Sequence, residues 1–143
     1  QWTDDENAGF TDGTPWLAMN PNYRQINVRE QEVRTDSVLA YYRRLVHLRK
    51  ADAYRETFTY GIFEPAYQEM ADVFAYYRVS GESGQRILVA ANFGTDAVSL
   101  PLAYPCRQVL LSNLRAESAV ETACEKANAL TLESCEVAVI ELG

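Results

Sequence analysis

The spacing of apolar residues changes near residue 54, and this change constrains the fold more than any other feature of the sequence. Over residues 36–50, apolar side chains recur every three to four positions, which predicts an amphipathic helix. After residue 54 the alternation becomes twofold, as in Val73–Val79, and a continuous apolar run appears at Ile87–Ala91. The sequence therefore predicts a helical segment followed by a longer β region.

The β region contains about seven candidate strands at the spacing of β-hairpins, which predicts an antiparallel β-sandwich. The candidates are Glu56–Phe63, Val73–Val79, Ile87–Ala91, Ala97–Leu100, Val109–Leu111, Ala129–Leu132 and Val137–Leu142. The expected core contains Phe74 or Tyr77 together with Leu88, Val89, Leu111, Val139 and Ile140. Arg115–Asn128 lacks a clear apolar stripe, so we expect a loop there with at most one helical turn.

Residues 1–35 have the composition of a long loop but carry too many apolar side chains for a solvated tail. Two clusters of helix breakers, Asn7–Pro15 and Asn20–Asn22, interrupt any regular element. The apolar side chains are Trp2, Phe10, Trp16, Leu17, Tyr23 and Ile26. Because structureless stretches of this length are uncommon inside compact domains, we expect this segment to pack on another part of a longer protein.

The charge and the hydropathy of the chain argue against two classes of partner. The formal net charge is −7, with seven bases against eight acids in residues 1–53 and six against twelve in residues 54–143. This acidic excess disfavours nucleic acid and anionic membranes, and no apolar run approaches the ~18 residues of a membrane span. The cysteines at 106, 124 and 135 lack metal-type spacing, so we expect idle thiols in a reducing cytoplasm.

Residue type and spacing reveal no complete catalytic site, and we expect no cofactor and no metal. His47, the only histidine, lies inside the expected helix, where a surface or core role is commoner than catalysis or zinc binding. The carboxylates of Asp4–Glu6 could serve glycoside hydrolysis as a pair, but consecutive loop residues usually fan outward. Trp2 and Trp16 could stack on sugars, although a buried core position is commoner for tryptophan.

The N-terminal residues contain Gln1-Trp2 followed by Asn7–Thr11 and then Gly13–Trp16. In this order these motifs resemble a signature of the α-amylase superfamily. The closer resemblance is to the group of oligo-1,6-glucosidases, dextran glucosidases and trehalose-6-phosphate hydrolases. Thr3 stands where that group usually has Asp, and Ser134-Cys135 stand where a Pro-Tyr pair is frequent. The residues that carry the resemblance are Gln1-Trp2, Asn7–Thr11, Gly13–Trp16, Asn20–Tyr23, Ile26–Val28, Asp36–Val38, Tyr41–Leu45, Leu48–Lys50 and Leu88–Phe93.

The resemblance implies a (β/α)8 catalytic barrel followed by an antiparallel β-sandwich, domain C. Residues 1–53 would be the C-terminal remnant of the barrel, a loop and the last helix, and residues 54–143 would be domain C. The family's Asp nucleophile, Glu acid/base and second Asp lie on earlier barrel strands, and none of those motifs occurs here. We therefore expect no catalytic residue in this chain. At most Gln1, Trp2 and Asp4 would border the active-site pocket.

The resulting expectation is a C-terminal fragment of a retaining α-glucosidase that is inactive by itself. The parent enzyme would act on an oligosaccharide or a phosphorylated disaccharide. The missing catalytic barrel would be the partner of the fragment, whose uncovered apolar surface could also drive self-association. The alternative is a free-standing carbohydrate-binding β module, in which Tyr60, Tyr67, Tyr76 and Tyr77 would form a sugar platform. Such a platform needs exposed, coplanar rings.

Overall fold

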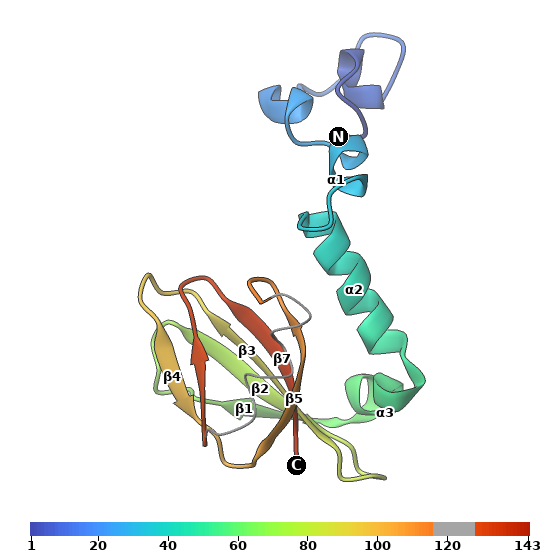
Figure 1. Cartoon of the computed structure of the whole chain (residues 1–143). Coiled ribbons are helices and arrows are strands. Elements are labelled where there is room, and N and C mark those ends of the chain that lie inside the picture. Colours follow the sequence, from blue (N-terminus) through green and yellow to red (C-terminus); the bar gives the residue numbers. More distant parts are fainter. Residues whose placement is uncertain (116–127) are drawn as a thin grey trace. The chain divides into compact units, whose positions relative to one another are not determined.

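A computed structural model describes residues 1–115 and 128–143, and it contains the predicted antiparallel β-sandwich after a helical segment (Figure 1). Most of the segment for which we expected a loop, Arg115–Asn128, lies outside the described residues. The chain divides into two compact units, Gln1–Val46 and His47–Gly143. None of the described helices is long and apolar enough to cross a membrane.

The first unit contains short helical turns and most of one long helix. Two 3-10 turns, η1 (Glu6–Gly9) and η2 (Pro21–Arg24), precede α1 (Val28–Glu32) and α2 (Val38–Lys50), and α2 continues into the second unit. The expectation of little regular structure over residues 1–35 is therefore corrected at these turns. Two asparagines cap these elements, since the side chains of Asn20 and Asn27 accept backbone N–H groups in the first turns of η2 and α1.

A third helix, α3 (Asp52–Tyr60), replaces most of the strand predicted at Glu56–Phe63. That prediction is wrong except at its last two residues, where β1 (Ile62–Ala66) begins. The helix buries Thr57 and Phe58, whose environment the local pattern could not indicate. Gly61 ends α3 by donating its N–H to the Thr57 carbonyl at 3.1 Å. A Cβ at Gly61 would lie 2.4 Å from that oxygen, which explains the glycine.

Two antiparallel sheets follow α3 in the described part of the second unit. The larger sheet has the strand order β1-β2-β3-β7-β5, and β4 pairs with β6 in the smaller one. Every predicted strand after the first is confirmed in place. The bounds are β2 Val73–Val79, β3 Arg86–Asn92, β4 Val98–Pro101, β5 Cys106–Ser112, β6 Ala129–Leu132 and β7 Val137–Leu142.

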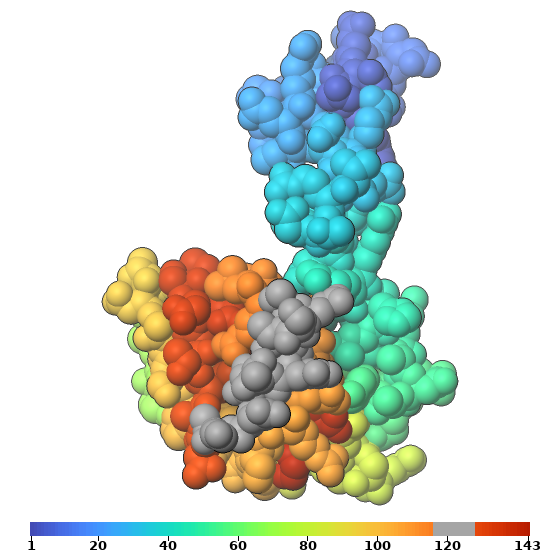
Figure 2. Space-filling model, in the orientation of Figure 1, coloured from blue at the N-terminus to red at the C-terminus, as the bar shows by residue number. Residues whose placement is uncertain are grey.

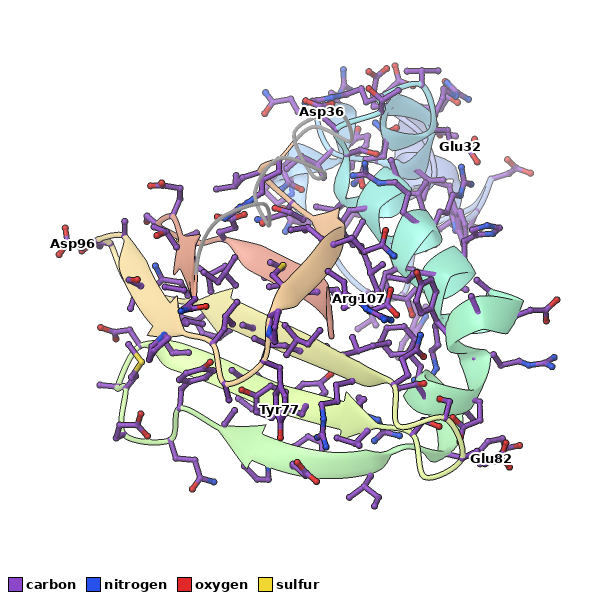
Figure 3. All side chains as sticks on the ribbon, turned by 60° about the horizontal axis from the view of Figure 1, so that its bottom comes forward. Glu32, Asp36, Tyr77, Glu82, Asp96 and Arg107 are labelled. Carbon is purple, nitrogen blue, oxygen red and sulfur yellow. The ribbon has the colours of Figure 1, made fainter. Side chains whose placement is uncertain are left out.

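The main core lies between the two sheets. Its buried members are Ala75, Leu88, Ala90, Leu100, Leu130, Leu132, Ala138, Ile140 and Leu142. Of the two aromatic candidates on β2, Tyr77 packs against this core (Figure 3), whereas Phe74 is 57% exposed on the opposite face. Leu88, Leu111, Val139 and Ile140 are buried as predicted, and Val89 is half-buried.

A fully buried carboxylate joins the turn before β7 to the end of β5. Glu136 accepts hydrogen bonds from the Ser112 hydroxyl at 2.8 Å, the Glu133 N–H at 2.9 Å and the Arg115 Nε at 2.6 Å. Burial by itself raises the pKa of Glu136, but the Arg115 guanidinium and the two other donors outweigh it and hold the pKa below its ordinary value. The ion pair thus holds the chain just after β5 against the turn before β7.

The cysteines differ from the expectation of idle thiols. Cys135 is a free and exposed thiol, as expected. Cys106 is disulfide-bonded, which corrects the prediction at that residue. Three cysteines permit one disulfide with one thiol left over, and spacing along the sequence carries no information on whether the bond forms.

Candidate functional site

The predicted pocket-border residues lie in a short segment, residues 1–5, that is held along the start of α1. The Val28 N–H donates to the Gln1 carbonyl and the Arg29 N–H to the Trp2 carbonyl, both at 3.0 Å. On its other side, the Trp2 N–H donates to the Ala8 carbonyl at 2.9 Å. The structure thus brings Gln1, Trp2 and Asp4 into one ordered segment, which we call the rim segment.

A strained turn contacts the rim segment through the hydrogen bond between Trp2 and Ala8. Three consecutive residues, Asn7, Ala8 and Gly9, have φ values of 57°, 52° and 74°, in the left-handed region that disfavours side chains. Ala8 is fully buried, and a Cβ at Gly9 would approach the Trp2 Cβ to 3.2 Å. Backbone strain of this kind persists where packing over-determines it and is common at functional sites.

Asp4 and Asp5 do not fan outward, contrary to the expectation for consecutive loop residues. Both carboxylates converge on the Arg29 guanidinium, with Asp4 Oδ1 at 2.8 Å from Nη1 and Asp5 Oδ2 at 2.7 Å from Nη2. The hydrogen bond from Arg29, together with one from Thr3, lowers the pKa of the exposed Asp5 carboxyl. Sequence reasoning missed Arg29 because no local motif links it to residues so far away along the chain.

An open apolar hollow of about 580 Å³ borders the rim segment at Gln1. Its other lining residues are Phe10, Thr11, Pro15, Trp16, Leu17, Ala18, Met19 and Asn20. Trp16 is 91% exposed and Trp2 57%, so neither tryptophan takes the buried core position that we considered commoner. These N-terminal segments are drawn in blue in Figure 2. The hollow is large enough for a ligand or for side chains of another protein segment.

A second polar cluster lies under α3 and joins the helix to the sheet. The Glu141 carboxylate is buried and accepts hydrogen bonds from Gln85 at 3.1 Å, Gln108 at 2.8 Å and the Tyr54 hydroxyl at 3.4 Å. Arg107, labelled in Figure 3, approaches the same carboxylate to 3.8 Å. Burial and the neighbouring Glu141 raise the pKa of Tyr54. These contacts satisfy one another, which indicates a structural role.

The remaining candidate residues do not form a reactive group. His47 is exposed on α2. Within residues 1–115 and 128–143, no group of three His, Cys, Asp or Glu side chains is placed to hold a metal ion.

The four tyrosines considered for a sugar platform do not share one surface. Tyr67 and Tyr77 pack against the core with their hydroxyls 3.5 Å apart, and the Tyr67 hydroxyl donates to the Pro101 carbonyl. Tyr76 on the other face contacts the Phe63 ring at 4.8 Å between centroids. Tyr60, the last residue of α3, is 80% exposed, so the four rings are not exposed together on one surface.

Comparison with known proteins finds relatives that include oligo-1,6-glucosidases and a trehalose-6-phosphate hydrolase. The family model for the alpha-amylase catalytic domain matches residues 1–61. The oligo-1,6-glucosidase of Parageobacillus thermoglucosidasius is 36% identical over 125 residues, which cover 85% of this chain and 21% of that protein. The trehalose-6-phosphate hydrolase of Bacillus subtilis is 38% identical over 98 residues, covering 68% of this chain and 17% of that protein.

Solved structures agree with these matches over the whole chain. The isomaltulose synthase from Klebsiella sp. LX3 superimposes with a TM-score of 0.85 and 32% identity, covering 100% of this chain and 24% of that one. The trehalulose synthase from Pseudomonas mesoacidophila MX-45 gives a TM-score of 0.84 and 30% identity, with the same coverage. The chain spans about a fifth of the length of the relatives that it matches. It belongs to the α-amylase family, glycoside hydrolase family 13.

Proposed function

We propose that this chain is the C-terminal part of a retaining α-glucosidase. Residues 1–53 would complete the catalytic barrel, and residues 54–143 would form domain C, a structural module. The carrying observation is the match of residues 1–61 to the amylase catalytic domain in a chain that leaves the apolar side chains of this region uncovered. Because a monomer rarely exposes so large an apolar surface, another protein segment should cover it.

The uncovered side chains support the barrel as the covering partner. Trp16 and Leu17 line the hollow and are exposed, and α2 has no buried residue along its whole length. Val38 and Tyr42 of this helix are also exposed. A barrel helix needs its apolar stripe to face the strands, so a missing barrel accounts for α2 and for the hollow together.

The proposed substrates are α-glucosides, either an oligosaccharide with α-1,6 linkages or a phosphorylated disaccharide. This proposal rests on the names of the relatives, which include a glucan 1,6-alpha-glucosidase from Streptococcus pneumoniae and the trehalose-6-phosphate hydrolase. Retaining hydrolysis needs two carboxyl groups about 5–5.5 Å apart on either side of the scissile bond. In this chain Asp4 and Asp5 instead share one arginine, which supports a catalytic pair supplied from elsewhere.

In the complete enzyme, Gln1, Trp2 and Asp4 would lie at the edge of the active-site pocket. Their place in one ordered segment beside the hollow supports this assignment. A cytoplasmic location is the further part of the proposal, and one observation opposes it. Cys106 is disulfide-bonded, and such bonds are rare in the cytosol of most organisms.

An activity assay with p-nitrophenyl α-glucoside tests the proposal. We expect no turnover from the purified 143-residue chain, and turnover from the complete polypeptide that contains it. Turnover that increases with the amount of purified chain and is abolished by Asp4→Asn would refute the structural role. Calorimetric titration of the chain with isomaltose tests the alternative, because saturable binding would favour a carbohydrate-binding module.

A further inference from the structure

We propose that Arg29 is a positioning residue that orders the rim segment, residues 1–5, for contact with the sugar. The inference rests on the proposed function, which puts Gln1, Trp2 and Asp4 at the edge of the active-site pocket. Arg29 itself need not touch the sugar. It would act through the two aspartates and through the main chain of Trp2.

The geometry of Arg29 combines three attachments to one short segment. Its guanidinium binds Asp4 and Asp5 with two different nitrogens, at 2.8 and 2.7 Å. Its backbone N–H donates to the Trp2 carbonyl at 3.0 Å. A guanidinium presents its donors in a rigid planar fork, so it can hold two carboxylates at a fixed separation, which the single ammonium of lysine cannot do.

The backbone that carries Arg29 is held in place by hydrogen bonds at the start of α1. Asn27, just before α1, is buried, its side chain accepts the Glu30 N–H at 2.9 Å, and its amide donates to the Tyr23 carbonyl at 2.9 Å. The first turn of α1 is thereby fixed from two sides. A positioning residue is effective only where its own backbone is held in this way.

The attachments leave one acceptor of the rim segment available. Asp4 binds Arg29 through Oδ1, and its Oδ2 accepts no hydrogen bond from the part of the chain that the structure describes. The Asp4 side chain is half-exposed, as is the Trp2 ring. An oriented carboxylate oxygen accepts sugar hydroxyls, and an indole ring packs on the apolar face of a sugar. Because these side chains are already held in place, they would lose less conformational entropy when a sugar binds.

Without Arg29, two adjacent carboxylates would repel each other and turn toward solvent. The Trp2 carbonyl could still bind the backbone N–H of residue 29, so the rim segment would loosen without detaching. We therefore expect an effect on sugar binding and a smaller effect on the chemical step. A loss of global folding is not expected, because the sandwich core lies in the other unit.

The test compares Arg29→Gln and Arg29→Lys with the matched control Arg34→Gln. Arg34 also pairs with an exposed carboxylate, that of Asp36 at 3.0 Å, and its replacement changes the charge equally. In the 143-residue chain, hydrogen exchange at the Trp2 and Thr3 amides should be about three- to tenfold faster in Arg29→Gln, as the loss of two exposed ion pairs predicts. Arg34→Gln should exchange like the wild type.

In the complete polypeptide, Arg29→Gln should raise KM for the α-glucoside about three- to tenfold and change kcat less than twofold, with Arg29→Lys in between. An unchanged KM in Arg29→Gln, or unchanged exchange at Trp2 and Thr3, would overturn the inference. A wild-type polypeptide without α-glucosidase activity would overturn the proposed function and the sugar role of Arg29 with it. The exchange measurement would still decide whether Arg29 orders the segment.

Discussion

Replacement of Arg115 by Met should destabilise the β-sandwich strongly at neutral pH and much less in acid. Arg115 is the cation that pairs with the fully buried Glu136, at 2.6 Å between Nε and Oε1. Removing one partner of a buried ion pair costs about 3–5 kcal/mol. Because Glu136 keeps the Ser112 hydroxyl and the Glu133 N–H, we expect about 3 kcal/mol, the lower end of that range. For a unit of this size the loss lowers Tm by about 15 °C.

The pH dependence follows from the sign of the pKa change of Glu136. In the wild type its folded-state pKa lies below the ordinary value of 4.5, so its stabilisation is present above pH 4.5 and is lost as the pH falls through the folded-state pKa. In Arg115→Met, burial is no longer outweighed, and the pKa of Glu136 should rise. Acidification then protonates Glu136 and relieves the penalty. The difference between variant and wild type should therefore shrink between pH 7 and pH 4.

The assay is urea denaturation of the 143-residue chain, followed by far-ultraviolet circular dichroism at both pH values. Arg107→Met is the matched control. Arg107 is largely exposed and forms a long ion pair, 3.8 Å, with the Glu141 carboxylate, so its loss should cost less than about 1 kcal/mol. A free energy of unfolding in Arg115→Met equal to that of the wild type would refute the reasoning. So would a penalty that is the same at pH 7 and pH 4.

Three further outcomes are expected. Val139→Asp should unfold the sandwich because it buries an unpaired charge at a cost of several kcal/mol, and a wild-type melting curve would contradict the placement of β7. Gly61→Ala should lower the free energy of unfolding by about 2 kcal/mol, because its Cβ would meet the Thr57 carbonyl oxygen. Calorimetry measures this loss, and a neutral effect would contradict the close packing at the end of α3. Light scattering should show concentration-dependent self-association through the exposed surface around Trp16 and Val38, and a monomer at all concentrations would argue against an uncovered interface.

The sequence by itself determined the elements whose signal lies in local periodicity. The helical stripe placed α2 within two residues, and twofold alternation, one continuous apolar run and the spacing of hairpins placed the strands from β2 to β7. The motif around Asn7–Trp16 was sufficient to indicate the α-amylase family, because it depends on residue identity and needs no knowledge of contacts. Which of Phe74 and Tyr77 enters the core was left open, since both faces of β2 carry aromatic residues.

Only the tertiary structure decided α3 and the contacts of the rim segment. Residues 56–63 alternate as a strand would, but the carbonyl of Phe58 accepts hydrogen bonds from Arg49 at 2.9 Å and Arg78 at 3.2 Å, which cap the helix from outside it. Arg29 likewise meets Asp4 across a separation of 25 residues. Periodicity reports on neighbours along the chain. Partners brought together by folding leave no such mark in a single sequence, so their pairing depends on the assembled structure.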